Sequence, residues 1–321
     1  MILVTGANGQ IGVDLLQALA DRHGGKQIVA TDLDGSDAHS PSDVTFEPLD
    51  VRSSDSLNEL LSTNEIDTIY HLAGILSANG EQNPDLCWDV NIGGLRNVLR
   101  AAIQRSLKVF WPSSIAVFGP RTVRDEAPQT ARTDPDTIYG ITKATGERLC
   151  QYYSGHHALD VRSIRFPGVI SYSAPPGGGT TDFAVEMFFG AIREGAYDCF
   201  VQEDTRLPMM YMPDAIKSVL DLMSADSDDL SVRMSYNVTA FSFSAGELAE
   251  SIRKYIPGFT CDFKPDFRQE IADTWPGSID DSVARSDWNW VPEFDLDAMV
   301  RDMLAHIGSS LGVPMEFPDS D

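Results

Sequence analysis

The stretch that decides the fold is Met1-Ile2-Leu3-Val4-Thr5-Gly6-Ala7-Asn8-Gly9-Gln10-Ile11-Gly12. Its residues 2–4 form a short apolar run, which is typical of a buried strand, and an amphipathic helical pattern begins near residue 10. The glycines between them follow the spacing G-x-x-G-x-x-G. The order of strand, glycine loop and helix predicts the first unit of a parallel α/β sheet.

The glycine loop also predicts a binding site. Gly6 permits a tight turn, Gly9 lets the backbone approach a pyrophosphate, and Gly12 allows the helix to lie close to the sheet. The positive helix N-terminus would then face the phosphates. A turn that is rich in glycine for conformational reasons only is the alternative, but the place directly after the first strand favours a dinucleotide. We also predict cofactor contacts from Gln10 and Ile11.

The same alternation continues outward from this stretch. Short apolar runs are separated by amphipathic stretches as far as residue 166. Repeated strand and helix units of this length predict an α/β fold, with a doubly wound, Rossmann-type parallel sheet covered by helices on both faces. The predicted strands are 2–4, 27–32, 44–49, 68–72, 109–112 and 161–166, with helices from about residue 10, near 84–105 and near 139–154.

The alternation breaks at Ser173-Ala174-Pro175-Pro176-Gly177-Gly178-Gly179, which can form neither a strand nor a regular helix. We expect a lobe boundary there. Residues 1–170 and about 208–240 are predicted to form the Rossmann-type domain that binds the dinucleotide, and about 171–207 with 241–321 a smaller α/β C-terminal substrate lobe. Later helices are predicted near 181–194, 213–224, 244–255 and 295–307, and the acidic tail after Pro314 is expected to fray.

Composition narrows the possible partners. The chain has 321 residues and is 42% hydrophobic, so it can bury a large core. Its 48 acidic and 24 basic residues give a net charge of -24, which repels nucleic-acid phosphates and anionic membranes, and we expect neither as a partner. The acidity fits a solvated surface that aids solubility, which we favour, or adaptation to high salt. An unfolding temperature that does not change with salt would exclude the second.

The sequence shows no pattern typical of an export leader, a membrane span or a metal site. No basic leader precedes the first apolar run, and no run approaches the roughly 20 uncharged apolar residues of a membrane span, so we expect a cytoplasmic protein. Cys87, Cys150, Cys199 and Cys261 lack the close pairs of a zinc site or a disulfide scaffold. We therefore expect reduced thiols and no metal.

Two strand ends carry acidic residues that suit a dinucleotide. Asp32 ends the second predicted strand, where a carboxylate can accept hydrogen bonds from the adenosine ribose and repels a 2′-phosphate. Leu33 and Asp34 follow it instead of arginines, so we predict NAD and not NADP; helix capping is the other role for Asp32. Asp50 and Val51 end the third strand where an adenine contact would fall, although a plain turn role fits nearly as well.

Residues Tyr139-Gly140-Ile141-Thr142-Lys143 place a phenol and an ammonium four residues apart, on one face of a predicted helix. A free tyrosine has a pKa near ~10. Lys143 and a positive nicotinamide ring would favour the phenolate, which makes Tyr139 a usable base near neutral pH. Lys143 can also bind the nicotinamide ribose. The pattern Y-x-x-x-K is common by chance, but its position after five strands of a nucleotide fold makes it informative.

The fifth predicted strand ends in Trp111-Pro112-Ser113-Ser114-Ile115, at the edge where ligands of such sheets bind. We predict that Ser114 is the third catalytic residue and holds the substrate oxygen beside Tyr139. Ser113 is the alternative, and a purely structural role for both serines stays open. Asn91 is predicted to bond to backbone and relay protons through water to Lys143, with an ordinary helical asparagine as an equal alternative.

Several motifs occur together: the glycine loop, His71-Leu72-Ala73-Gly74, Ser114 and Tyr139-x-x-x-Lys143. In this combination the first half resembles the extended short-chain dehydrogenase/reductases, relatives of the nucleotide-sugar epimerases. The second half is more specific and resembles the short-chain L-threonine 3-dehydrogenases. That resemblance is carried by residues 175–182, which read PPGGGTTD, 207–212, which read LPMMYM, 236–242, which read YNVTAFS, and 271–276, which read IADTWP.

The resemblance implies NAD-dependent oxidation of L-threonine at its 3-hydroxyl to 2-amino-3-oxobutyrate. It also implies substrate contacts from Ser77 and Trp275, although Trp275 fits an interlobe core equally well. A homodimer that pairs through the helices near 84–105 and 139–154 is expected, as in the family. We count Leu72, Ala73, Gly74 and Pro167 among the cofactor contacts.

The residues of the lobe boundary support this substrate independently. Residues 177–179 are expected to leave backbone donors accessible, and Thr180 and Thr181 to cap the next helix, whose positive N-terminus would hold a carboxylate. Gly179, Thr180 and Thr181 are therefore predicted substrate contacts, with a glycine-rich hinge as the alternative. A nucleotide sugar would need Arg or Lys for its diphosphate. Nucleotide-sugar epimerase or dehydratase activity, and a non-catalytic NAD-binding sensor, stay open as other functions.

Overall fold

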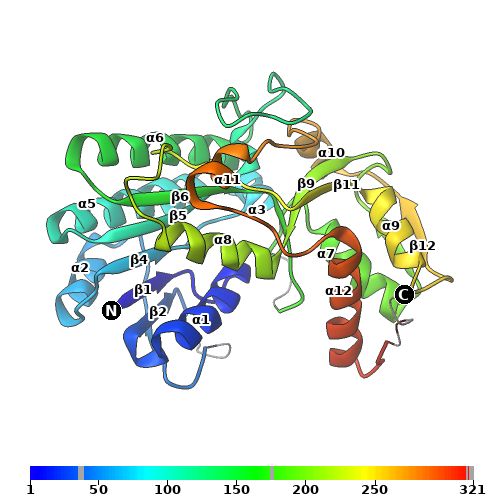
Figure 1. Cartoon of the computed structure of the whole chain (residues 1–321), viewed down its shortest axis with the longest axis horizontal. Helices are drawn as coiled ribbons and strands as arrows, with labels where there is room; N and C mark the ends of the chain where they lie inside the picture. The colour runs from blue at the N-terminus through cyan, green and yellow to red at the C-terminus, as the bar shows by residue number, and fades with distance from the viewer. Residues whose placement is uncertain (35–39, 174–176, 316, 318–321) are drawn as a thin grey trace.

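The computed structural model describes residues 1–34, 40–173, 177–315 and 317 of the chain. Figure 1 shows the N-terminal strands and their helices at one end of the molecule, and the C-terminal helix with its neighbours at the other. Of the predicted break, residues 174–176 lie outside the described residues, and residues 177–179 form neither helix nor strand. Most of the acidic tail also lies outside them.

The central sheet is parallel throughout. Within the described ranges it contains seven strands in the order β10-β6-β5-β4-β1-β2-β3. The predicted α/β fold with a doubly wound parallel sheet is confirmed. The strands are β1 Ile2–Thr5, β2 Ile28–Asp32, β3 Thr45–Pro48, β4 Thr68–His71, β5 Lys108–Ser114, β6 Val161–Phe166 and β10 Tyr236–Asn237.

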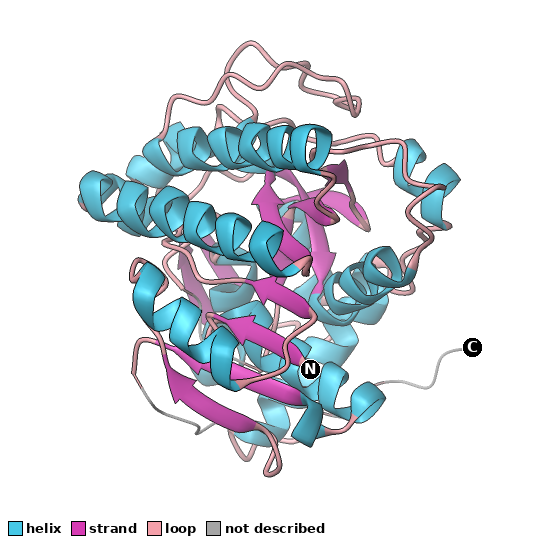
Figure 2. Cartoon of the chain, turned by 90° about the vertical axis from the view of Figure 1, so that its left-hand side faces the viewer, coloured by secondary structure: helices cyan, strands magenta, loops and turns pink. Residues whose placement is uncertain are grey.

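Side chains of the sheet alternate between two cores because successive residues of a strand point to opposite faces. In β1, Ile2 and Val4 belong to one buried cluster and Leu3 to the other. Figure 2 shows the strands lying between two layers of helices. One layer contains α1 Gln10–His23 and α8 Met212–Ser224, and the other contains α2 Ser54–Thr63, α5 Leu95–Arg105 and α6 Ile138–His157.

The predicted helix over 84–105 is not a single α-helix. It consists of α4 Pro84–Trp88, a π-helical segment Asp89–Gly94 and then α5. The apolar periodicity passes through the π segment, so sequence reasoning missed it. Asn91 lies in this segment and exchanges hydrogen bonds with the backbone of Ile75, at 2.8 Å to Oδ1 and 3.1 Å from Nδ2. The wide π turn therefore coincides with a fixed contact to the loop after β4.

Two smaller sheets of the described residues lie outside the large one, and most of their buried apolar residues belong to a separate cluster. A three-stranded sheet has the order β11-β9-β7, and β12 pairs in parallel with β8. β10 and α8 lie with the large sheet, while the predicted division of the chain into domains stays a prediction. The elements are β7 Gly168–Ile170, β8 Ala196–Cys199, β9 Arg206–Tyr211, β11 Phe241–Ser244, β12 Thr260–Phe263, α3 Ser77–Gln82, α7 Phe183–Arg193, α9 Ala245–Arg253, α10 Phe267–Ala272, α11 Ser282–Trp288 and α12 Leu296–Ser310.

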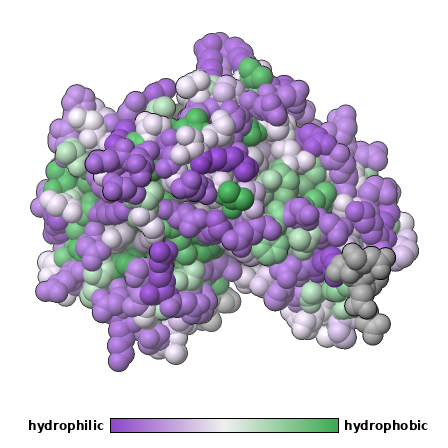
Figure 3. Space-filling model, in the orientation of Figure 1, coloured by the Kyte–Doolittle hydropathy of each residue, from purple (hydrophilic) through white to green (hydrophobic). Residues whose placement is uncertain are grey.

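The surface is largely hydrophilic on the face that Figure 3 shows, with smaller hydrophobic areas between polar ones. No helix in the described residues is long and apolar enough to cross a membrane. In the same part of the chain, His, Cys, Asp and Glu side chains do not gather in a group that could hold a metal ion. All four cysteines are free thiols, and three of them are buried.

Two glycines of α6 allow a matched test of packing against the sheet. A Cβ at Gly146 would lie 2.4 Å from the buried ring of Trp111, whereas a Cβ at Gly155 would meet no atom within 4 Å. We expect Gly146→Ala to lower the free energy of unfolding by about 1–3 kcal/mol through overpacking. Gly155→Ala should raise it by up to about 1 kcal/mol through helix propensity. Urea denaturation measures both, and equal effects would contradict the packing.

Candidate active site

A cavity of about 410 Å³ opens at the carboxyl edge of the central sheet, where loops after β1, β4, β5 and β6 converge. Helix α6, residues 179–182 and Trp275 complete its wall. The cavity brings together all the predicted catalytic and substrate residues and most of the predicted cofactor contacts. Lining residues from those predictions are Gly6, Gly9, Gln10, Ile11, Gly12, Leu72, Gly74, Ser77, Ser114, Tyr139, Lys143, Pro167, Gly179, Thr180, Thr181 and Trp275.

The glycine loop is packed too closely for side chains. Gly6 has φ +72°, and a Cβ there would lie 2.5 Å from the amide nitrogen of Ala73. A Cβ at Gly12 would lie 2.5 Å from the carbonyl oxygen of Gly6. Gly9 is the N-cap of α1 and has no side chain to cap it, so the first turn keeps amide donors for an anion. The loop therefore fits the pyrophosphate of a dinucleotide.

Asp32 is fixed by the backbone at the end of β2. Its Oδ2 accepts a hydrogen bond from the amide of Asn8 at 2.9 Å, and its Oδ1 accepts one from the amide of Leu33 at 2.8 Å. Each oxygen of a carboxylate has a second lone pair, so Asp32 can also accept from ribose hydroxyls. The side chain is thus tied directly to the glycine loop, as the dinucleotide interpretation requires.

Five predicted cofactor contacts do not line the cavity. Asp32 and Ala73 lie against the glycine loop just described. The carboxylate of Asp50 is paired with Arg52 at 2.6 Å, which lowers the pKa of Asp50, and Val51 packs under the π segment at Gly94. Asn91 gives its hydrogen bonds to Ile75, Cys87 and Thr142. Its contacts position the loop after β4 and do not show a proton relay.

Tyr139 and Ser114 meet inside the cavity. Tyr139 is 8% exposed, and burial raises its pKa to about 12, while a hydrogen bond with Ser114 acts in the opposite direction. The sequence predicted a phenolate near neutral pH, and the protein alone does not provide one, because desolvation outweighs the favourable contacts. Ser113, the alternative to Ser114, instead donates to Glu147 at 2.7 Å and is buried. The contacts therefore favour Ser114 as the partner of Tyr139.

Lys143 is buried with its charge partly compensated. Its Nζ donates to the carbonyl oxygen of Pro112 at 2.7 Å and lies 4.8 Å from the centre of the Trp111 ring. It also lies 5.6 Å from the ring of Tyr139. Burial lowers the pKa of Lys143 to about 8, so the ammonium form still predominates at neutral pH. A cation held beside the phenol is the arrangement that proton removal from an alcohol needs.

At the other end of the cavity, the segment around Ser77 and the segment 177–182 are joined by hydrogen bonds. Thr180 donates its amide to Ser77 Oγ at 3.3 Å, and the two hydroxyls are 3.2 Å apart. The expected helix cap was wrong: Asp182, and neither Thr180 nor Thr181, is the N-cap residue of α7. Asp182 Oδ2 accepts the amides of Gly178 at 2.9 Å and Gly179 at 2.7 Å. The backbone donors that the sequence suggested for a substrate carboxylate are therefore already used.

Asp182 and Asn79 are polar lining residues that sequence reasoning missed. The side chain of Asp182 makes no cap hydrogen bond to α7, so the N-cap pattern of an aspartate before an apolar helix does not describe its role. Burial raises the pKa of Asp182 to about 6, against the lowering effect of the two amide hydrogen bonds. Trp275 lies in the same region, 4% exposed, and its indole Nε1 has no hydrogen-bond partner among the described residues. This end of the cavity thus offers a carboxylate and hydroxyls, with the indole of Trp275 beside them.

Comparison with known proteins identifies the family. The model of the NAD dependent epimerase/dehydratase family matches residues 2–238. The chain belongs to this family. It is 46% identical over 308 residues to an uncharacterized epimerase/dehydratase of Staphylococcus aureus, covering 95% of this chain and 96% of the relative. The predicted membership of the extended short-chain dehydrogenase/reductases is confirmed.

Solved structures of similar proteins carry a more specific name. L-threonine dehydrogenase from Phytophthora infestans is 50% identical with a TM-score of 0.93, over 96% of this chain and 99% of that chain. A monomeric L-threonine 3-dehydrogenase from a metagenome database is 49% identical with a TM-score of 0.94, over 97% and 99%. This family member therefore shares its fold, nearly end to end, with threonine dehydrogenases.

The half-buried carboxyl of Asp182 predicts a pH effect on stability. Its pKa is about 6 in the folded chain against an ordinary value of 3.8, so ionising it between these values costs folding free energy. Asp182→Asn, which keeps an acceptor for Gly178 and Gly179, should gain in unfolding temperature relative to the unchanged chain as pH rises from 4 to 7. Thermal unfolding at several pH values measures this difference.

Asp266 is the matched control, because Arg268 lowers the pKa of its carboxyl. Ionisation of Asp266 therefore favours folding, and its contribution is lost as pH falls through the lowered pKa. Asp266→Asn should therefore change little relative to the unchanged chain between pH 4 and 7, where this carboxyl is ionised in both states, and should lose unfolding temperature relative to it only as pH rises toward 4. The same trend in both variants would contradict the assignment.

Proposed function

We propose that this protein oxidises L-threonine at its 3-hydroxyl with NAD, giving 2-amino-3-oxobutyrate. The observation that carries the proposal is the content of one cavity. Ser114, Tyr139 and Lys143 line it together with Asp182 and Trp275, and no arginine lines it among the described residues. The similarity to threonine dehydrogenases at about half identity supports the same reaction.

The residues of the first lobe suit NAD. Gly6, Gly9 and Gly12 leave room for a pyrophosphate, and Asp32 supplies a carboxylate for the ribose hydroxyls and against a 2′-phosphate. Lys143 lies where it can bind the ribose on the nicotinamide side. When bound, the cofactor supplies a hydride acceptor and a positive charge near Tyr139.

The chain's own residues then perform the proton transfer. Ser114 holds the threonine hydroxyl, and Tyr139 removes its proton as the hydride leaves the β-carbon. The positive charge of Lys143 stabilises the phenolate that this step requires. Because burial alone raises the pKa of Tyr139 to about 12, the base forms only when additional positive charge lies beside it.

The amino-acid part of the substrate fits the other end of the cavity. Asp182 suits the ammonium group, since it is a carboxylate already held by two backbone amides. The hydroxyls of Ser77 and Thr180 and the indole N–H of Trp275 are donors for the substrate carboxylate. In this proposal the substrate ammonium, and not its carboxylate as the sequence suggested, lies beside residues 178–182.

The defining experiment follows NADH absorbance with a panel of substrates. L-threonine should give the highest kcat/KM, ahead of allo-threonine and serine, and UDP-sugars should give no product. Conversion of a UDP-sugar without net NADH would instead indicate an epimerase or dehydratase, in line with the name of the staphylococcal relative. NAD binding without turnover of any hydroxy amino acid would indicate a sensor.

Replacement of the proposed base gives a sharper prediction. Tyr139→Phe should lower kcat by roughly 10² to 10⁴ because the proton acceptor is lost. NAD affinity, measured by calorimetry, should stay nearly unchanged, since the phenylalanine ring fills the same space. Near-normal turnover by this variant would end the mechanism.

The oligomeric state stays a prediction. The family resemblance favours a homodimer, whereas one similar solved structure is described as monomeric. Exposed apolar side chains at Trp88, Ile141 and Tyr152 lie on α4 and α6, where pairing was expected. Light scattering at working concentrations decides between the two states.

A further inference from the structure

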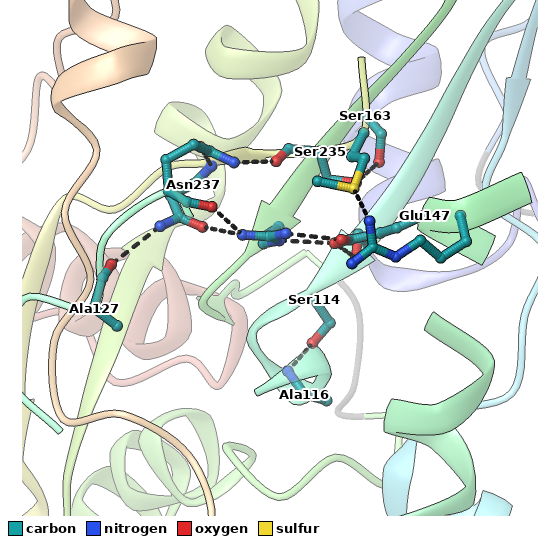
Figure 4. A network of polar contacts seen from close by, with 12 residues as sticks. Ser114, Ala116, Ala127, Glu147, Ser163, Ser235 and Asn237 are labelled. Atoms are coloured by element: carbon teal, nitrogen blue, oxygen red, sulfur yellow. Dashed lines mark hydrogen bonds and ion pairs between the residues drawn. The ribbon is translucent and has the colours of Figure 1, made fainter. Parts of the chain in front are cut away.

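A buried ion pair lies one helical turn after Lys143 on α6. Glu147 on α6 and Arg165 on β6 are 2% and 1% exposed, and they form two parallel hydrogen bonds of 2.8 Å. Figure 4 shows the row of contacts that runs from Asn237 to Glu147, with Ser114 and Ala116 alongside. Such bidentate pairs fix geometry as well as charge.

The pair is connected on both sides. Arg165 Nη1 donates to the carbonyl oxygen of Gln129 and to Asn237 Oδ1, each at 3.1 Å. Glu147 Oε1 accepts from Ser113 Oγ at 2.7 Å. The network therefore joins β5, β6, β10 and α6, the elements that position the cavity.

Two of the three proposed catalytic residues, Lys143 and Ser114, have a close neighbour in this network. Glu147 follows Lys143 by four residues on α6, so the two side chains lie on one helix face. Ser113 directly precedes Ser114 at the end of β5. The network thus touches the elements that carry the charge of Lys143 and the hydroxyl of Ser114.

Stability alone is a weak reason for such a pair. Taking two ions out of water costs several kcal/mol for each, and apolar replacements of buried pairs are often neutral or stabilising. The hydrogen bonds described above satisfy the pair but do not require it at this place. The position of the pair, one helical turn from Lys143, therefore suggests a role in the site and not in stability alone.

We propose that Glu147 and Arg165 are positioning residues for the reaction: Glu147 keeps Lys143 charged and, through Ser113, fixes Ser114 beside Tyr139. This inference rests on the proposed function for its kinetic part, while its electrostatic part concerns the chain itself. Arg165 holds the Glu147 carboxylate in place through two hydrogen bonds.

Among the titratable side chains that face Lys143, Glu147 is the anionic one. The titratable groups that face Lys143 are Cys87 on α4, Cys150, Glu147 and Tyr139 on α6, and His71 at the end of β4. Burial raises the pKa of both thiols and of Tyr139, and lowers that of His71 to about 3, so these four groups are neutral at neutral pH. Of these groups, only Glu147 bears a negative charge that offsets the cost of burying the ammonium.

The direct test titrates Lys143 without any substrate. The sequence contains six lysines, at 26, 108, 143, 217, 254 and 264, so carbon-13 NMR of ε-labelled lysine can resolve them, with Lys143→Arg to assign the signal. In Glu147→Gln the titration midpoint of Lys143 should fall by about one pH unit or more, since a nearby opposite charge is lost. The alkaline limb of kcat/KM for L-threonine should move to lower pH by the same amount.

A matched control exists on the surface. Lys217 and Asp221 form a partly exposed pair at 2.8 Å with the same four-residue spacing on α8. Asp221→Asn should leave the Lys143 midpoint and the pH profile unchanged. The comparison separates the effect of the buried charge from a general effect of losing one carboxylate.

Two further variants keep the proposal falsifiable. If Glu147→Gln does not fold, Glu147→Gln/Arg165→Gln removes both buried charges and should lower the Lys143 midpoint in the same direction. Ser113→Ala keeps the ion pair, so it should leave the midpoint unchanged and lower kcat about tenfold with little change in KM. A tenfold loss corresponds to about 1.4 kcal/mol in the barrier.

An unchanged Lys143 midpoint in a folded Glu147 variant overturns the electrostatic part. Wild-type kcat in Ser113→Ala overturns the positioning of Ser114. A shifted midpoint in a protein that oxidises no hydroxy amino acid supports the charge assignment and contradicts the proposed function instead. The two failures are therefore distinguishable.

Discussion

Parallel pairing on both sides of β1 is the constraint on which the rest of the molecule depends. Thr5 is in register with Thr31 of β2 and with His71 of β4, so three strands end side by side. The chain must turn at Gly6 in a space where a Cβ would lie 2.5 Å from the backbone of Ala73. Only backbone fits there, and the first turn of α1 is consequently held against the end of the sheet. The loops after β1, β4, β5 and β6, which line the cavity, all begin at this edge of the sheet.

Burial then determines what the catalytic side chains can do by themselves. It raises the pKa of Tyr139 to about 12 and lowers that of Lys143 to about 8. At neutral pH the pair is therefore a phenol beside an ammonium, and proton removal depends on further positive charge entering the cavity. Deprotonation of Tyr139 is therefore coupled to cofactor binding, because Tyr139 stays protonated until that positive charge is present. The buried carboxylate of Glu147 fits the same logic, since it keeps the ammonium charged in a place where burial opposes it.

Local patterns predicted those parts of the site that one segment builds alone. The glycine loop after β1 and the Tyr139 and Lys143 pair on α6 need only strand order and helical spacing, and both line the cavity. The role of Asp182 was missed because its partners, Gly178 and Gly179, sit in a loop whose backbone direction no periodicity reveals. Contacts between segments that are distant in the sequence could not be predicted from local patterns either. The pairing of Glu147 with Arg165 depends on how α6 lies on β6, and the π segment around Asn91 depends on the loop at Ile75.

The substrate end of the cavity is where this chain departs from a nucleotide-sugar site. A diphosphate calls for guanidinium groups, and none lines the cavity in the described residues. Asp182 would instead repel a phosphate. Its Oδ2 is held by two backbone amides, while its Oδ1 makes no hydrogen bond among the described residues. A carboxylate fixed through one oxygen, with the other available and its charge poorly solvated, is suited to a small cation. In the proposed reaction, an amino acid presents such a cation on the carbon next to the one that bears its hydroxyl, and Tyr139 and Asp182 line the same cavity.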